Sequence, residues 1–293
     1  MIAHAHALAH LSDPHLSSLE GVAWSQLMSK RALGYWSWRR RRRYVHKREA
    51  LDRVVADLLA TAPDLVLISG DLTHIGLPAE CETAARWLDG LPRPICLVPG
   101  NHDRYVADDP STTTERWARY LGGAGRPWPR VTRLPGLAIV ALDSAVPSAP
   151  LLATGTLGAA QRDELACVLA TTGAEGRFRV VMLHHSPLPN GHAWRKRLTD
   201  ARALMTLLDE HGAELVIHGH GHVERIDRVS TRRGEMIVVA APSASDARDG
   251  RGGWNRYRIE GEVGGWTVEL TARRLHGDAV VTASEQRFEV LRA

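Results

Sequence analysis

Long apolar runs and an even set of cysteines are both missing from this chain of 293 residues. No apolar stretch approaches the ~18–20 residues that a transmembrane helix needs. The N-terminal segment MIAHAHALAHLSD has no basic region and no A-x-A-like cleavage site, so it does not predict a signal peptide. The three cysteines, Cys81, Cys96 and Cys167, stand at unrelated spacings, which argues against a disulfide framework. We therefore expect a soluble cytoplasmic protein.

Acidic residues are absent between Glu20 and Glu49, a segment that instead contains five consecutive arginines at positions 39–43. The formal net charge of the whole chain is only +4, so the basic character is concentrated in this segment. Such a local patch is typical of one binding surface rather than of a protein that coats nucleic acid. The hydrophobic fraction of 44% predicts a substantial core.

Apolar stretches and helical patterns alternate along most of the chain and predict an α/β fold. Buried strands are expected at 65–69, 95–99, 137–143, 179–183, 214–218 and 236–243. Helices are expected from about 44 to 60 and near 78–89, 112–121, 157–171 and 198–211, with Thr112 and Glu115 as a capping box for the third of these. Strands at 254–260 and 266–274 predict an antiparallel meander and a β-rich C-terminus. No repeat or linker divides the chain, so we predict a single domain over residues 1–293.

Polar clusters follow four of these strands and a first strand that ends ahead of Asp13, at the edge where α/β sheets usually hold their sites. The clusters are SDPH, GDLTH, GNHD, HHSP and HGHGH. Aspartate, histidine and asparagine donors without a thiolate favour divalent Mn, Fe, Zn or Co. There are too many donors for one ion, and two ions that share a carboxylate suit in-line displacement at phosphorus. Each motif alone is weak evidence, whereas five in this order are highly specific.

The series D-x-H, GD, GNHD, H and GHxH resembles the calcineurin-like binuclear metallophosphoesterase superfamily, and in particular its small bacterial phosphodiesterase branch. The motifs run from Asp13 to His222. The resemblance implies a four-layer αββα sandwich and two divalent metal ions. Carried over by position, one metal would be bound by Asp13, His15 and His222, the other by Asn101, His184 and His220, and both by Asp71. His185 is the alternative to His184. His102 would be the catalytic residue, with Asp103 orienting it.

Further candidates surround these motifs. His74 and His192 fall in loops that should open toward the site, and Arg195 follows the loop of His184 closely enough to meet a phosphate. We expect all three to contact substrate. His4, His6 and His10 alternate with alanines ahead of the first strand, where tail or core histidines are expected rather than a third metal.

Residues 17–44 form an insertion that leaves the sheet beside Asp13 and His15, which places it at the rim of the site. Its apolar residues Trp24, Leu27, Met28, Ala32 and Tyr35 have near-helical spacing and lead into the arginine run. This composition is expected of an interfacial element on anionic lipid. Two alternatives remain: contact with single-stranded nucleic acid or nucleotides, and a local cap with solvated arginines.

The expected function is a phosphodiesterase that hydrolyses a lipid-linked phosphodiester or pyrophosphate by in-line attack of a metal-bridging hydroxide. Arg39 and Arg40 would bind the phosphorylated substrate, and the protein would make peripheral contact with the anionic inner face of the membrane. The alternative is a phosphodiesterase or nuclease for soluble nucleotides or single-stranded nucleic acid, although a nucleic-acid partner is not expected. A non-catalytic binding module on the same fold is a further alternative, opposed by the complete set of metal ligands.

Overall fold

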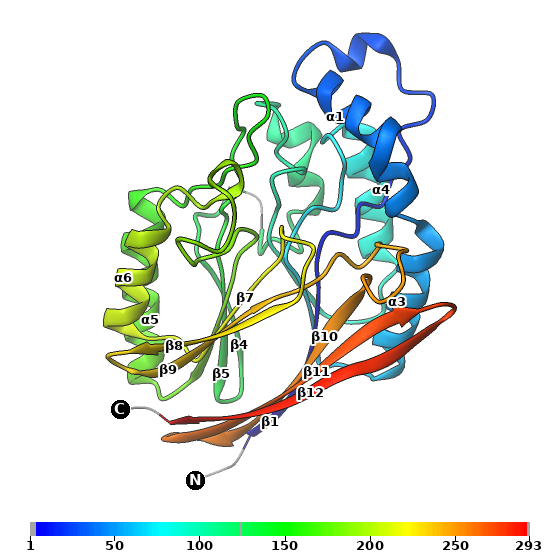
Figure 1. Ribbon diagram of the computed structural model, residues 1–293. Coiled ribbons are helices and arrows are strands. Elements are labelled where there is room, and N and C mark those ends of the chain that lie inside the picture. Colours follow the sequence, from blue (N-terminus) through cyan, green and yellow to red (C-terminus); the bar gives the residue numbers. More distant parts are fainter. Residues whose placement is uncertain (1–3, 124, 292–293) are drawn as a thin grey trace.

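Two six-stranded sheets face each other in the computed structural model, which describes residues 4–123 and 125–291 (Figure 1). The order of the first sheet is β12 (Ala279–Leu291), β11 (Gly265–His276), β10 (Gly253–Glu262), β1 (His4–Leu11), β2 (Leu65–Ile68) and β3 (Ile95–Leu97). The order of the second is β4 (Arg130–Leu134), β5 (Leu137–Ala141), β6 (Phe178–Met182), β7 (Leu215–His218), β9 (Gly234–Ala240) and β8 (Arg225–Thr231). Strands β1, β2 and β3 run parallel, as do β5, β6, β7 and β9.

Helices cover the outer face of each sheet (Figure 1). Helices α3 (Arg48–Ala60) and α4 (Pro78–Asp89) pack on the first sheet, and α5 (Ala159–Ala174) and α6 (Ala201–His211) pack on the second. The predicted four-layer αββα sandwich is confirmed. Helix α3 begins at Arg48, later than expected, because His46 and Lys47 are extended.

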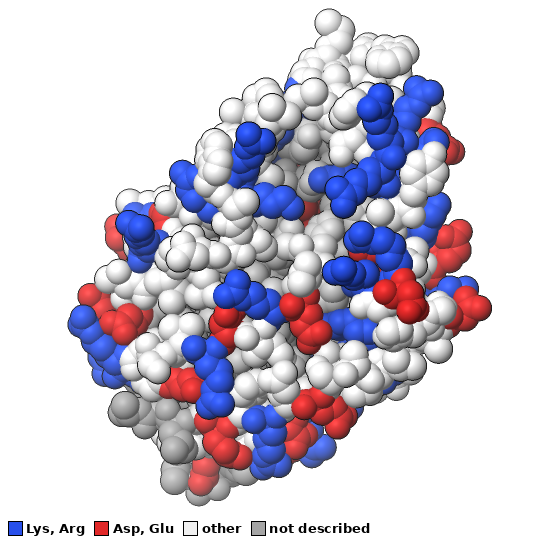
Figure 2. All heavy atoms as spheres, in the orientation of Figure 1, with Lys and Arg blue, Asp and Glu red and all other residues white. Residues whose placement is uncertain are grey.

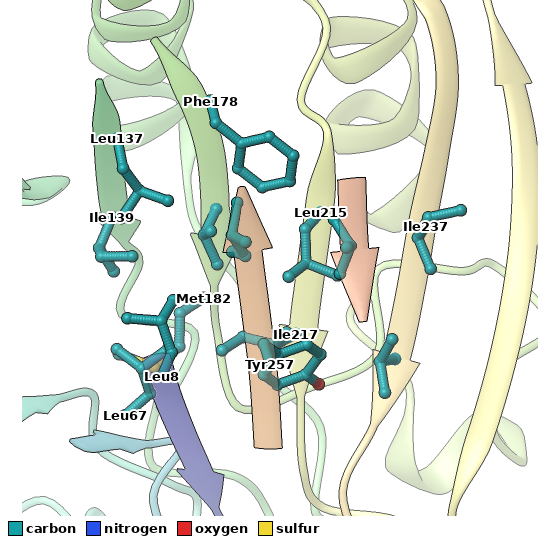
Figure 3. Close-up of a cluster of buried hydrophobic side chains, with 14 of the residues drawn as sticks. Leu8, Leu67, Leu137, Ile139, Phe178, Met182, Leu215, Ile217, Ile237 and Tyr257 are labelled. Atoms are coloured by element: carbon teal, nitrogen blue, oxygen red, sulfur yellow. The ribbon is translucent and has the colours of Figure 1, made fainter. Parts of the chain in front are cut away.

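The core between the sheets follows from the alternation of side chains along each strand. Leu65 and Leu67 of β2 point toward the second sheet, whereas Val66 and Ile68 point toward α3 and α4. Figure 3 shows Leu67 and Tyr257 of the first sheet together with residues of the second, such as Ile217. This packing fixes both sheets, and therefore their strand ends, relative to each other.

The C-terminal strands form the expected antiparallel meander, extended by β12, which was not predicted. Strand β9 was expected, but its hairpin partner β8 and the edge strand β4 were not, because the side chains of β8 and β4 are half exposed and lack a clear apolar pattern. His4, His6 and His10 do not precede the first strand but lie within β1. His10 is fully buried, and its Nε2 atom lies 2.8 Å from the Ser69 hydroxyl.

The helix predicted at 112–121 is wrong. Two short 3₁₀ turns stand there instead, η3 (Pro110–Thr112) and η4 (Thr114–Trp117). The cap is Asp109, whose side chain accepts a hydrogen bond from the Ser111 N–H at 2.9 Å, rather than the Thr112–Glu115 box. Trp117 is fully buried, and its Nε1 donates to the carbonyl of Cys81 at 2.8 Å. The segment is thus held on α4 by this one tryptophan and not by the apolar face of a regular helix.

The insertion folds as a chain of short turns. These are η1 (Trp24–Leu27), α1 (Arg31–Ser37), the wide turn η2 (Trp38–Arg42) and α2 (Arg43–Val45). The expected apolar stripe is wrong: Leu27 and Trp38 are buried in a small core with Ile75 and Tyr105, whereas Trp24 and Met28 are 75% and 86% exposed. Breaks between the turns rotate residues away from a single face. No helix in the described part of the chain is long and apolar enough to cross a bilayer.

Two basic residues attach the insertion to the body of the protein. Arg31 donates to the carbonyls of Ile75 and Gly76 at 3.1 and 2.8 Å and forms an ion pair with Asp108. Lys30 donates to the carbonyl of Leu152 at 3.0 Å. These contacts come from both halves of the sandwich, so the insertion is held across the top of the molecule.

Candidate metal centre

The five polar clusters meet at one edge of the sandwich because the strands that carry them run parallel in each sheet. Strands β1, β2 and β3 lead to the first three clusters, and β6 and β7 lead to the other two. The residues thus brought together are Asp13, His15, Asp71, Asn101, His184, His220 and His222. The last two come from the turn after β7, which reaches across to β1 through a 3.1 Å hydrogen bond from the His220 N–H to Asp13 Oδ2.

The backbone at this edge is strained. Seven non-glycine residues in the described part of the chain have a positive φ, and five of them are predicted metal ligands: Asp13, His15, Asp71, His220 and His222, with φ between 42° and 67°. Each such conformation costs on the order of 1–3 kcal/mol and persists where the surroundings or the function require it. The strain therefore marks this edge as the functional site.

Two glycines allow the ligand loops to approach one another. A Cβ atom on Gly100 would lie 2.2 Å from Asp71 Oδ1, and one on Gly219 would lie 2.7 Å from Asp13 Oδ2. Both separations are shorter than any real contact allows. Any larger residue at these two positions would displace the carboxylates.

Donor atoms form two groups that share Asp71. In the first, atoms of Asp13, His15, Asp71 and His222 all lie within 4.8 Å of one another. In the second, Asp71, His184 and His220 meet the same limit. Asn101 joins the second group, since its Oδ1 lies 3.1 Å from His184 Nε2. His185 belongs to neither group, and its Nδ1 lies 2.8 Å from the Ser144 hydroxyl.

The imidazoles are oriented to present Nε2. His15 Nδ1 donates to the carbonyl of Thr73 at 2.8 Å, and His184 Nδ1 donates to that of Ser69 at 2.6 Å. A carbonyl accepts only, so each ring keeps its Nε2 lone pair free for a metal. Nε2 of His15 and of His220 is buried without a hydrogen-bond partner. Orphaned nitrogens beside shared carboxylates fit a pair of divalent cations.

The electrostatics of the centre also favour cations. Burial alone would lower the pKa of His184, but the carboxylates of Asp71 and Asp13 raise it to about 9. Burial opposes ionisation of Asp13 too, yet His222 and its other partners hold its pKa below the usual value. A place that stabilises a proton on imidazole this strongly has a negative potential, which a divalent ion satisfies equally well.

His102 lies beside the two groups, but its partners differ from those expected. Its Nδ1 is 2.5 Å from the carbonyl of His74, so this carbonyl orients the ring. Asp103, predicted to orient His102, accepts instead from the backbone N–H groups of Gly100, Asp71 and Thr73 at 2.9–3.0 Å. Asp103 thereby ties together the ligand loops after β2 and β3. Burial and the neighbouring Asp71 raise the pKa of Asp103 to about 7.

Of the five residues predicted to contact substrate, some lie beside the donor groups and others do not. His74 is buried and stacks on His15 at 4.9 Å, behind that ligand. The ring of His192 lies 5.4 Å from that of His220, at the edge of the second donor group. Arg195 is exposed and packs over Trp194. Arg39 and Arg40 are also exposed, and Arg40 stacks on Trp36 at 4.2 Å. The last three side chains therefore do not reach the donor groups.

Two residues of the site were missed, and a third was assigned to the neighbouring position. Arg42 places Nη1 2.7 Å from Nε2 of His102. His46 forms a donor group with His15 and His222, while its Nδ1 lies 2.9 Å from the Ser245 hydroxyl. Lys196, rather than its neighbour Arg195, lines the cleft beside His222. No sequence pattern distinguishes Arg42 within five identical residues, and the turn that aims it is set by tertiary contacts.

The fold and the two donor groups that share one carboxylate are typical of metal-dependent hydrolases that bind two ions. The family model for calcineurin-like phosphoesterases matches residues 6–224. This chain therefore belongs to the calcineurin-like phosphoesterase family and is a phosphoester hydrolase.

Curated relatives come from bacteria. A probable cyclic nucleotide phosphodiesterase of Synechococcus is 28% identical over 74% of this chain and 80% of its own length. A 3',5'-cyclic adenosine monophosphate phosphodiesterase of Pseudomonas aeruginosa is 28% identical over 80% of this chain and 75% of its own length. Among solved structures, a dimetal phosphatase from Danio rerio matches with a TM-score of 0.65 and 13% identity, covering 98% of this chain and 99% of that one. This structural match supports the fold alone.

Proposed function

We propose that the protein is a binuclear metal-dependent phosphodiesterase that acts on soluble nucleotide phosphodiesters. The observation that carries the proposal is the pair of donor groups joined by Asp71. Asp13, His15, Asp71 and His222 would hold one divalent ion, and Asp71, Asn101, His184 and His220 the other. When bound, the ions neutralise charge on the phosphate and lower the pKa of a nucleophilic water.

The surrounding residues position the substrate. Arg42 has guanidinium N–H groups besides the one that faces His102, and a phosphoryl oxygen can accept from them. His102 is held by the His74 carbonyl at a fixed orientation next to Arg42. Arg42 would therefore contact a phosphoryl oxygen through these N–H groups, and His102, whose Nε2 accepts from Arg42, would hold the guanidinium in place. Arg42 takes the part that Arg39 and Arg40 were expected to take.

The names of the curated relatives favour a soluble nucleotide over the lipid-linked substrate expected from the insertion. Both relatives described above bear the name of a cyclic nucleotide phosphodiesterase. Their matches cover about three quarters or more of each chain. Cyclic nucleotides are accordingly the first substrates to test.

A hydrolysis assay tests this proposal. Protein purified with Mn²⁺ is expected to hydrolyse bis-(p-nitrophenyl) phosphate and 3',5'-cyclic AMP, and His102→Gln to lower kcat by roughly 10²-fold or more. His211→Gln, a change of a histidine at the last residue of α6, outside both donor groups, is the matched control. Absence of hydrolysis with every divalent metal tried, or full activity in His102→Gln, would refute the mechanism.

One observation supports a lipid-linked substrate as the second candidate. The rim of the insertion exposes Trp24, Met28 and Trp36, which are 75%, 86% and 56% accessible. Aromatic side chains beside arginines suit an anionic bilayer surface. Flotation with anionic liposomes, compared between the wild type and Trp24→Ser/Trp36→Ser, decides between the two. The lipid-linked candidate would be favoured if the double variant lost both flotation and activity on lipid diesters but kept its activity on soluble diesters.

A further inference from the structure

A cleft of about 340 Å³ opens directly beside the metal centre. The end of the insertion forms one wall, and Lys196, the turn at 221–223 and the loop of Arg248 and Arg251 form the others. His222, a proposed ligand, and Arg42, the partner of His102, both line it. The cleft is therefore continuous with the place where the scissile phosphate would lie.

Its charge is of one sign. Five lining residues are cationic and none is acidic: Arg41, Arg42, Lys196, Arg248 and Arg251. Figure 2 shows Lys and Arg side chains gathered on both sides of a hollow in the upper half of this face. Arg248 is neutralised by an ion pair with the buried Asp246. Arg41, Lys196 and Arg251 form no ion pair with any carboxylate in the described part of the chain.

A neighbouring cavity provides the contrast. The space on the other side of His46, about 350 Å³, is also lined by basic residues, but Glu20 and Glu49 share its wall. Mixed charge of that kind is ordinary protein surface. The cleft beside His222 has no acidic residue in its lining to balance the cations. These cations lie close enough to repel one another. Burial and the guanidinium of Arg42 both lower the pKa of Lys196.

A single phosphodiester does not account for this many cations. It has one negative charge, which Arg42 and the proposed metal ions already face. Arg41, Lys196 and Arg251 line the same cleft and pair with no carboxylate among the residues that the structure describes. Crowded cations of one sign are unfavourable unless an anion binds among them. The anion must be compact and must accept two or more hydrogen bonds, as a phosphate group does.

We propose that Arg41, Lys196 and Arg251 form a second phosphate subsite, so that the preferred substrate is a nucleotide with a second phosphate group besides the one that is hydrolysed. The inference rests on the proposed function for the position of the first phosphate. The second phosphate has two possible sources: a P–O–P linkage to the scissile phosphate, or a separate phosphodiester elsewhere on the ligand.

Selectivity among substrates distinguishes these sources. The double variant Arg41→Gln/Lys196→Gln is compared with Arg202→Gln/Arg287→Gln, which removes the same charge from exposed residues outside the cleft. The substrates are 3',5'-cyclic AMP, di(adenosine-5') diphosphate and cyclic diadenosine monophosphate. The cleft variant is expected to lower kcat/KM for one of the two-phosphate substrates at least roughly 10-fold more than for cyclic AMP. A selective loss of kcat/KM for di(adenosine-5') diphosphate indicates that the second phosphate is joined to the scissile one by a P–O–P linkage. A selective loss for the cyclic dinucleotide indicates that it belongs to a separate phosphodiester. Equal losses for all three substrates would overturn the proposal.

A binding measurement separates this inference from the proposed function. Inorganic pyrophosphate is titrated into chelator-treated protein by calorimetry, so that no divalent ion contributes. The wild type and the surface variant are expected to bind it at least roughly 10-fold more tightly than the cleft variant does. Equal affinity in all three proteins would overturn the subsite even if every diester is hydrolysed. Binding that depends on the cleft, in a protein that hydrolyses no diester, would refute the proposed function alone.

Discussion

Nη1 of Arg42 lies 2.7 Å from Nε2 of His102, although the two residues are 60 positions apart in the chain. Because Nδ1 of His102 faces the carbonyl of His74, a neutral ring presents an unprotonated Nε2 to the guanidinium. The insertion thus contributes a cation to the residue predicted to assist catalysis. Within the arginine run, Arg42 contacts His102 and Arg41 lines the neighbouring cleft.

The first prediction concerns this pair. Arg42→Gln is expected to lower kcat/KM for phosphodiesters by about 10²-fold, the usual loss when one donor to developing charge is removed. Arg40→Gln, two positions away on the exposed side, is expected to have little effect. Steady-state kinetics on both variants checks this. A larger loss in Arg40→Gln than in Arg42→Gln would restore the sequence-based assignment.

The second prediction concerns the contact between the insertion and the body of the protein. A Cβ atom on Gly34 would lie 2.5 Å from Ile75 Cγ2 and 2.7 Å from the Tyr105 hydroxyl. Gly34→Val should therefore displace α1, at a cost of about 1–3 kcal/mol, and move Arg42 away from His102. We expect kcat/KM to fall toward the value of Arg42→Gln.

A double-mutant cycle isolates this effect. In the Arg42→Gln background, Gly34→Val should add little further loss, because both changes remove the same contact. Leu33→Ala, at the neighbouring exposed position, serves as the control. Fully additive losses would mean that Gly34→Val acts by another route.

The third prediction concerns metal binding. Asp71 belongs to both donor groups, whereas Asp13 belongs to one. Asp71→Asn is therefore expected to reduce the affinity for both ions, and Asp13→Asn mainly for one, since a neutral amide is a weaker ligand than a carboxylate. Metal analysis after dialysis measures the bound equivalents. Asp52→Asn, a surface change on α3, is the control, and retention of two equivalents by Asp71→Asn would contradict the assignment.

Local patterns in the sequence predicted the α/β fold and the polar clusters, whereas the four-layer sandwich and the assignment of ligands were implied by the family resemblance. Buried strands give apolar stretches, and parallel strands place the following clusters at one edge. What the sequence did not predict depends on tertiary contacts. The break at His46 and Lys47, the wide turn that aims Arg42 and the capping of η3 by Asp109 have no periodic pattern. The family resemblance assigned Asp103 to orient His102, whereas the fold turns it toward Asp71 and Thr73.

The fourth prediction concerns stability. Arg179 and Glu214 form a bidentate ion pair at 2.7 and 3.1 Å, and each side chain is only 4% exposed. Glu214→Ala would leave a buried guanidinium without its carboxylate, so the free energy of unfolding should fall by about 3–5 kcal/mol. Urea unfolding measures the change. Asp227→Ala, which breaks the exposed pair with Arg225, should cost no more than about 1 kcal/mol; similar costs for both variants would be inconsistent with this account.

The last prediction concerns the cysteines. Burial raises the pKa of the Cys96 thiol to about 11, and burial together with Asp103 and Glu80 also raises that of Cys81. Cys167 is exposed on α5. Because the thiolate is the reactive form, native protein at pH 8 should react rapidly with a thiol reagent at one cysteine, and unfolded protein at all three. Cys167→Ser should abolish the rapid phase without changing hydrolysis. Rapid modification of Cys81 or Cys96 in the native protein would show that the packing of α4 or β3 is looser than the structure describes.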